Sequence, residues 1–285
     1  MKPRPRSEAA PSLPGVLSHM NSRFSVICES EILYHLDKAL RNPSRREVHN
    51  LRRALRTGQA FQALLASPVD PLSMNYKKTL RRTLRATRKL RNADVLRVFL
   101  KREGIRLSDR FSRKRGAIRL CRRLRKIWTP GSREEFGRIC RKMSQKLWNA
   151  FPERANGLDR ELERVLKDLG IFYFLWSSGT EKDFSSVHKL RIHLKLISGK
   201  EKVLSGIEGR EEFLDKGRKS DLQKILRLLG KLSDLLMFEE IYPRLEGKGR
   251  ERRRFLGRIR ELKRRTDSKI VRVLASRVPE VSSSS

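Results

Sequence analysis

Residues 48–56 read VHNLRRALR, and residues 187–195 read VHKLRIHLK. The second segment repeats the histidine and the main basic positions of the first at an offset of 188 − 49 = 139 residues. At 3.6 residues per helical turn, each histidine lies on the same side of its helix as the basic residues at i+3 and i+7. The valine and the leucines lie on the neighbouring side of the helix. The pattern predicts two equivalent amphipathic helices, each with a basic stripe beside a buried apolar seam.

A second pair of basic segments repeats further along the chain. Residues 80–90 and residues 222–232 share leucine and basic positions at an offset of 224 − 82 = 142 residues. Two blocks in the same order with nearly the same offset indicate an internal duplication. We therefore predict one domain over residues 21–277, made of two helical repeats at about residues 21–125 and 133–277.

The residue types favour an all-α fold. Long stretches are rich in Leu, Arg, Lys, Glu and Ala, and runs of Val, Ile and Thr alternating with polar residues are missing. Proline and glycine interrupt these stretches, for example at residues 42–44 and from Gly104 to Gly116, which leaves about eight to ten predicted helices. Residues 1–20 are predicted to be a disordered basic arm, and residues 278–285 a flexible tail.

Several protein classes are excluded. The longest apolar stretch, Ile171 to Trp176, is far too short to span a bilayer, so no membrane insertion is expected. The three cysteines, Cys28, Cys121 and Cys140, have no spacing typical of a zinc site or a disulfide framework. The N-terminal segment lacks the continuous apolar core of a secretory signal. We therefore expect a cytoplasmic protein.

The charge of the chain is strongly unbalanced. Its 68 Lys and Arg residues against 32 Asp and Glu give a formal net charge of +36. Between Tyr76 and Leu100, nine basic residues accompany the single acid Asp94, although like charges at i,i+4 destabilise a helix. Such self-repulsion favours a polyanion as the partner. The predicted binding residues form four ladders at i, i+3 and i+7: His49, Arg52 and Arg56; Arg82, Arg85 and Lys89; His188, Arg191 and Lys195; Lys224, Arg227 and Lys231.

The accompanying residue types narrow the class of polyanion. Proteins that bind single-stranded nucleic acid usually stack bases on aromatic side chains, and the basic segment from Tyr76 to Leu100 offers only Tyr76 and Phe99. No zinc finger, basic zipper or Gly-rich RNA-binding signature is present. The first choice is therefore inorganic polyphosphate or another phosphate-rich polyanion. The alternative is sequence-nonspecific binding of RNA or DNA.

No catalytic motif is found. The sequence has no phosphate-cradling Gly-rich loop, no nucleophile elbow and no helical His-Glu-x-x-His metal site. We expect a binding protein rather than an enzyme, with no catalytic residue, no metal and no cofactor.

The repeated segments resemble a known family. Residues 49–56 followed by residues 87–95, TRKLRNADV, resemble the first half of the conserved histidine α-helical domain, or CHAD, family. Residues 188–195 followed by residues 229–234, LGKLSD, resemble its second half. The resemblance implies two pseudo-symmetric four-helix bundles around a basic central groove or pore. It also implies non-catalytic binding of inorganic polyphosphate and association with polyphosphate granules. Three positions depart from the family pattern: Gln59, Arg88 and Asn92.

Some side chains remain open to more than one interpretation. The histidines that open two of the ladders can be ligand contacts or structural residues. His19, His35 and His193 have no repeat partner and are predicted to be structural or surface residues. Asp94 and Asp234 follow basic ladders, and capping or an ion pair with arginine is favoured over metal ligation.

Overall fold

The computed structural model describes residues 29–64, 71–104, 113–177, 185–208, 214–241 and 250–275. Within these ranges the chain forms nine helices and no strand, so the predicted all-α fold is confirmed. No helix in the described ranges has the length and apolar character needed to cross a membrane. The predicted arm at residues 1–20 and the predicted tail at residues 278–285 lie outside the described residues.

Four helices cover the first repeat. They are α2 (Glu31–Arg41), α3 (Arg45–Leu64), α4 (Pro71–Arg102) and α5 (Arg113–Ile127). The α2–α3 connection falls at residues 42–44, as predicted, because Pro43 disfavours a helical conformation at the residue before it. The Ser44 hydroxyl then accepts the Glu47 backbone N–H at 3.1 Å and caps the start of α3.

Five helices follow. They are α6 (Pro130–Asn156), α7 (Leu158–Ser177), α8 (Ser185–Glu208), α9 (Lys216–Ile241) and α10 (Arg250–Ala275). Pro130 occupies the first position of α6, where a missing N–H costs no intrahelical hydrogen bond. The Asp215 carboxylate accepts the Arg218 backbone N–H at 3.0 Å and caps α9.

One predicted break is shorter than expected. The sequence suggested an interruption from Gly104 to Gly116, whereas α5 begins at Arg113 and includes Gly116. A Cβ atom at Gly116 would lie 3.1 Å from Leu90 Cδ1 of α4. The missing side chain lets α5 approach α4 closely, and this packing compensates for the poor helix propensity of glycine.

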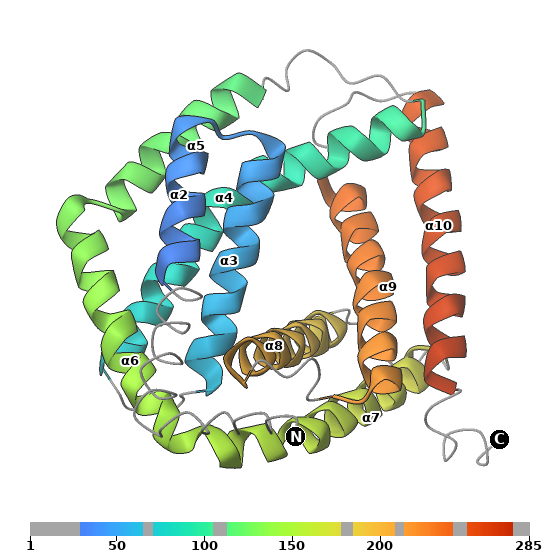
Figure 1. The fold of residues 1–285 in the computed structure, drawn as a ribbon. Helices are drawn as coiled ribbons and strands as arrows, with labels where there is room; N and C mark the ends of the chain where they lie inside the picture. The colour runs from blue at the N-terminus through green and yellow to red at the C-terminus, as the bar shows by residue number, and fades with distance from the viewer. Residues whose placement is uncertain are drawn as a thin grey trace, which may run out of the picture.

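The helices pack in two closed circuits (Figure 1). In the first, α2 packs on α3, α3 on α4, and α4 on α5, which returns to α2. In the second, α7 packs on α8, α8 on α9, and α9 on α10, which returns to α7. The long helix α6 contacts α4 and α7 and so connects the circuits.

Helices α3 and α8 join the two circuits directly. A Cβ atom on Gly199 of α8 would lie only 2.6 Å from Ala60 Cβ of α3, so a glycine is required at this crossing. Ala60 and Gly199 are also 139 positions apart, the same offset that relates the two histidine segments. Equivalent positions of the two repeats therefore meet each other at the crossing.

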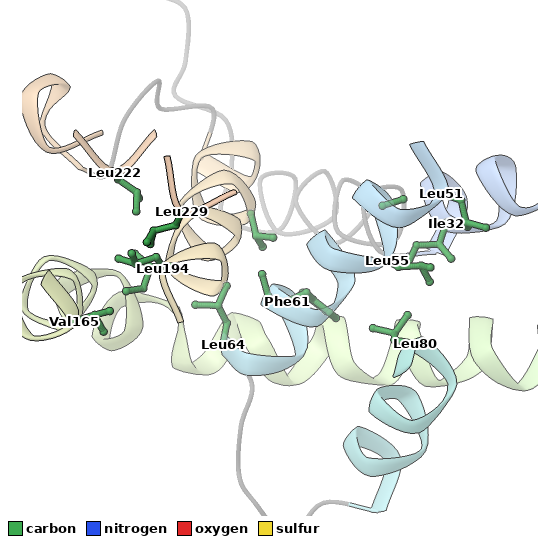
Figure 2. Close-up of a cluster of buried hydrophobic side chains, with 14 of the residues drawn as sticks. Ile32, Leu51, Leu55, Phe61, Leu64, Leu80, Val165, Leu194, Leu222 and Leu229 are labelled. Atoms are coloured by element: carbon green, nitrogen blue, oxygen red, sulfur yellow. The ribbon is translucent and has the colours of Figure 1, made fainter. Parts of the chain in front are cut away.

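A shared hydrophobic core supports this junction. Phe61 and Leu64 of α3, Leu194 of α8 and Leu229 of α9 belong to one cluster of buried side chains (Figure 2). A second, smaller cluster joins the C-terminal part of α4 to α9 and α10. The core thus holds α3 and α8 in a fixed relation, and with them the basic ladders that they carry.

Candidate polyanion-binding site

Helices α3 and α8 carry the two histidine ladders beside buried seams. Val48, Leu51 and Leu55 are buried on α3, and Val187 and Leu194 are buried on α8. The apolar sector predicted for both helices is therefore the sector that packs into the core. Because the basic stripe borders this seam, its residues next to the core are drawn into the interior of the molecule.

Six basic side chains from three helices form what we call the central cation cluster. Its members are Arg52 and Arg56 of α3, Arg88 and Arg91 of α4, and Arg191 and Lys195 of α8. The charges of Arg56, Arg88 and Arg91 lower the pKa of Arg52, and those of Arg56 and Arg91 lower the pKa of Arg191. The cluster therefore brings residues from both repeats within electrostatic range of each other.

Burial and mutual repulsion depress the pKa values of the cluster. Burial is the main cause at Arg52 and Arg191, where the pKa falls to about 10, and at Lys195, where it falls to about 6. Burial also lowers the pKa of Arg56, yet this residue is solvent-exposed. Arg56 is therefore a member of the cluster that an incoming anion can contact directly.

Hydrogen bonds to neighbouring helices hold two of these guanidinium groups in place. Arg52 Nη1 donates to the Leu84 carbonyl oxygen at 2.9 Å and to Thr87 Oγ1 at 2.7 Å. Arg191 Nη1 donates to Ser233 Oγ at 3.2 Å, and its buried Nε has no partner within the described residues. An unpartnered buried donor is unfavourable, so Arg191 has bonding capacity left for a ligand.

Within the described ranges, the charge of one acid acts on these cations. Asp234 of α9 pairs with Arg91 at 3.0 Å, and its charge raises the pKa of Arg56, Arg191 and Lys195. The other acid singled out in the sequence, Asp94, pairs with Arg113 at 2.9 Å. The prediction that both aspartates form ion pairs with arginine is thereby confirmed.

The two ladder histidines lie at the edge of the cluster. His49 and His188 are both exposed and occupy the first turns of α3 and α8. Burial and neighbouring cations lower both pKa values, so both rings are mainly neutral at pH 7. Of the other histidines, His193 is exposed and His35 packs edge-on against Tyr34, as expected of surface and structural residues. His19 lies outside the described residues.

The structure does not gather all twelve predicted residues at one place. Lys89 lines a cavity between α4 and α5. Lys231 lines a hollow between α4 and α9, where the charges of Lys269 and Arg102 help to lower its pKa after burial. By helical spacing, Arg82 shares the face of Lys89, and Lys224 shares the face of Lys231.

The remaining two predicted residues, Arg85 and Arg227, are exposed on α4 and α9. The ladders of α3 and α8 therefore converge, whereas of the α4 and α9 ladders only Lys89 and Lys231 line a hollow, each a different one.

Two members of the cluster, Arg88 and Arg91, were missed by the sequence interpretation. They lie on the face of α4 that also carries Leu84 and Thr87, the partners of Arg52. Basic residues surround α4 on several faces, so only their spacing from Thr87 could have singled them out. At the 142-residue offset their counterparts are Gly230 and Ser233, so the site is richer in charge on the side of the first repeat.

The described residues offer no group of three or more His, Cys, Asp or Glu side chains placed to hold a metal ion. A scan of protein-family models, a search of curated proteins and a search of solved structures each found no match to this chain. The site must therefore be interpreted from its own geometry and charge.

Proposed function

We propose that this chain binds inorganic polyphosphate, without chemical change, at the central cation cluster. One observation carries the proposal: six basic side chains from three helices lie within electrostatic range of one another, and two of them, Arg56 and Arg88, are exposed to solvent. A polymer of closely spaced negative charges would neutralise several of these cations at once. Arginine guanidinium groups suit this role because they stay charged and donate two parallel hydrogen bonds to phosphate oxygens.

The proposal includes a groove between two pseudo-symmetric four-helix bundles, as in the CHAD family that the sequence resembles. Two features support this arrangement. The helices close into two circuits of four, α2 to α5 and α7 to α10. Ala60 and Gly199, which are equivalent in the two repeats, meet at the α3–α8 crossing. Contact between equivalent residues is what a pseudo-twofold axis through this crossing would produce.

The surroundings of the cluster favour polyphosphate over nucleic acid. Tyr76 and Phe99, the aromatic residues of the basic segment in α4, are both buried in the core. They stack on other aromatic rings, Tyr76 on Phe136 and Phe99 on Phe238, and so offer no platform for a base. The described cations of the site are guanidinium and ammonium groups, which suit phosphate oxygens.

Sequence-nonspecific binding of RNA or DNA is the alternative. Both ligands release counterions and would show steep salt dependence, so salt dependence does not separate them. We would titrate medium-chain polyphosphate against a labelled duplex, and the duplex against labelled polyphosphate, at one fixed ionic strength. Polyphosphate should displace the duplex at equal phosphate concentration. If the duplex displaces polyphosphate instead, the chain is a nucleic-acid-binding protein.

A further inference from the structure

A cavity separate from the central cation cluster lies between α4 and α5. Its volume is about 250 Å³. On α4 it is bordered by Lys89 and Arg97, which lie on a different helical face from Arg88 and Arg91 of the cluster. A ligand in this cavity would therefore not occupy the central cation cluster.

The floor of the cavity is apolar. Leu90 of α4 and Leu120 of α5 are both buried, and Ala86 and Ala93 complete the floor from α4. The short side chains of Ala86 and Ala93 leave this space open. Gly116 of α5 also lines the cavity, and its missing side chain allows α5 to approach α4 at this level. Binding is favoured when an apolar group displaces water from an apolar floor of this kind.

The rim of the cavity is basic. It consists of Lys89, Arg97, Arg113, Arg119 and Arg123, and no acidic residue is among the described residues that line it. Arg113 is held from behind, because its Nε donates to Asp94 Oδ1 at 2.9 Å and its Nη2 donates to the Pro43 carbonyl oxygen at 2.6 Å. A fixed guanidinium group loses little conformational freedom when an anion binds.

We propose that this cavity binds a compact phosphate monoester whose organic part is a small apolar group. The organic group would lie on the floor formed by Leu90, Ala93 and Leu120, and the phosphate would meet the arginines of the rim. Inorganic phosphate would leave the floor in contact with water, and a neutral apolar molecule would make no use of the positive charge of the rim. A ligand that carries both a phosphate and an apolar group would contact the rim and the floor at once.

The test uses 1-naphthyl phosphate as the probe, followed by its own fluorescence, on the full chain at fixed ionic strength. Inorganic phosphate and neutral 1-naphthol serve as the two partial probes. We expect the wild-type chain to bind 1-naphthyl phosphate at least tenfold more tightly than either partial probe. Arg123→Ala should weaken this binding about tenfold, because one charge-assisted contact is lost.

Two further variants distinguish a built cavity from general charge. Ala93→Phe fills the floor and should abolish binding of the probe, with folding monitored by circular dichroism. Arg122→Ala removes the same charge from an exposed position of α5 that does not line the cavity, and it should leave binding unchanged. If Ala93→Phe does not fold, the comparison of Arg123→Ala with Arg122→Ala still decides the question.

Three results would overturn the inference. They are equal affinity for 1-naphthyl phosphate and inorganic phosphate, equal losses in Arg123→Ala and Arg122→Ala, or unchanged probe binding in a folded Ala93→Phe variant. None of them bears on polyphosphate binding, which we would measure on the same variants. Polyphosphate affinity should be unchanged in Ala93→Phe, so the two proposals succeed or fail separately.

Discussion

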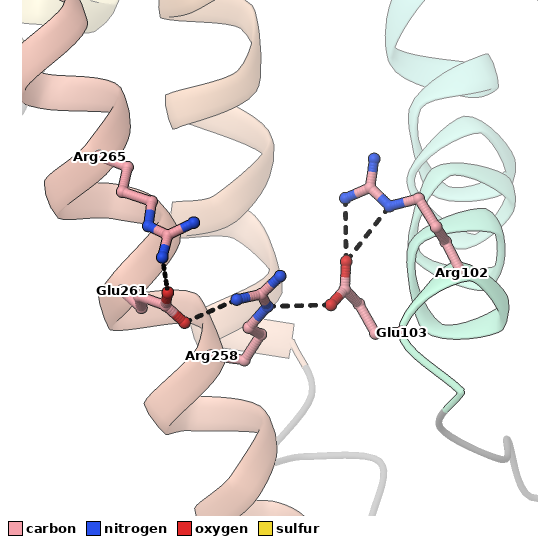
Figure 3. A network of polar contacts seen from close by, with 5 residues as sticks. All are labelled: Arg102, Glu103, Arg258, Glu261 and Arg265. Atoms are coloured by element: carbon pink, nitrogen blue, oxygen red, sulfur yellow. Dashed lines mark hydrogen bonds and ion pairs between the residues drawn. The ribbon is translucent and has the colours of Figure 1, made fainter.

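Arginine has opposite surroundings in two regions of this molecule. In the central cation cluster, six basic side chains lie within electrostatic range of one another, and the carboxylate of Asp234 acts on four of them. At the junction of α4 with α10, guanidinium and carboxylate groups alternate (Figure 3). There Glu103 accepts from Arg102 at 3.1 Å and from Arg258 at 3.0 Å, and Glu261 accepts from Arg258 at 2.6 Å and from Arg265 at 2.5 Å.

The pKa values shift in opposite directions in the two regions. Hydrogen bonds to Glu261 and Glu103 raise the pKa of Arg258, whereas burial and neighbouring cations lower the pKa of Arg52. At the junction every arginine has a carboxylate partner within the fold, whereas most arginines of the cluster have none among the described residues. Arginine at the junction therefore contributes to stability, while arginine in the cluster holds positive charge that a bound polyanion would neutralise.

The largest expected effect comes from removing arginine from the cluster. Arg52→Ala or Arg191→Ala alone should weaken polyphosphate binding roughly 10-fold to 100-fold, since a charge-assisted hydrogen bond contributes about 1.5–3 kcal/mol. The double variant should lose more than either single variant. Its salt dependence should be shallower by about one phosphate contact per arginine removed. Titrations at several salt concentrations measure both quantities.

A matched control tests whether location matters for this loss. Arg253→Ala and Arg254→Ala remove the same charge from exposed positions of α10. They should change the affinity for polyphosphate only slightly. Equal losses in the control and in the cluster would mean that diffuse positive charge, rather than a built site, explains the binding.

The second effect is on pH dependence. Because the pKa of Lys195 is about 6 in the free protein, its amine is mainly neutral at pH 8. A bound polyanion favours the charged amine, so Lys195 should take up a proton when polyphosphate binds. The affinity for polyphosphate should therefore rise about tenfold from pH 8 to pH 6.5. Calorimetry in two buffers with different ionisation enthalpies measures the proton uptake.

Lys195→Arg tests the assignment of this proton. Arginine stays charged, so the variant should bind at pH 8 about as tightly as at pH 6.5. Burial and neighbouring cations lower the pKa values of His49 and His188 from 6.5, and Asp234, Arg56, Arg91 and Arg191 contribute fixed charges around Lys195. A His49→Gln/His188→Gln variant should keep most of the pH dependence. If it loses that dependence and Lys195→Arg does not, the histidines take up the proton.

A smaller effect is expected from the one acid of the cluster. Asp234→Asn removes the charge that pairs with Arg91, and so makes the cluster more positive and more accessible to an anion. We expect polyphosphate to bind about twofold to fivefold more tightly, within the range of a partly exposed ion pair. Asp168→Asn, which changes an exposed carboxylate of α7, is the control. Weaker binding in Asp234→Asn would show that Asp234 positions Arg91 for the ligand.

The sequence predicted the helices of the site better than their contacts. Val48 and Leu51 recur at helical spacing with the basic residues beside them, and a local pattern of this kind determines which face of α3 is buried. The face that α4 turns toward Arg52 depends on tertiary packing instead. Basic residues surround α4 on several sides, so nothing local distinguishes Arg88 and Arg91 from Arg82 and Lys89.

The smallest effect is expected at the junction, and it concerns stability rather than binding. Glu103→Gln keeps the shape of the side chain and removes the carboxylate that Arg102 and Arg258 share. We expect a loss of about 1 kcal/mol in the free energy of unfolding, because both arginines remain partly solvated and Arg258 keeps its ion pair with Glu261. The C-terminal end of α4 repels a carboxylate, which limits the loss further.

The pH dependence of this loss identifies its origin. Burial acts to raise the pKa of Glu103, but hydrogen bonds from Arg258 and Arg102 outweigh it, and the net pKa lies below 4.5. A carboxylate with a lowered folded-state pKa contributes stability above its unfolded pKa and loses it as the pH falls. Thermal unfolding should therefore separate Glu103→Gln from the wild type at pH 7, and the two should converge as the pH falls through the lowered pKa of Glu103.

The affinity of Glu103→Gln for polyphosphate should equal that of the wild type. If Glu103→Gln weakens polyphosphate binding as much as Arg191→Ala, the junction and the cluster belong to one functional unit, and the distinction between them fails.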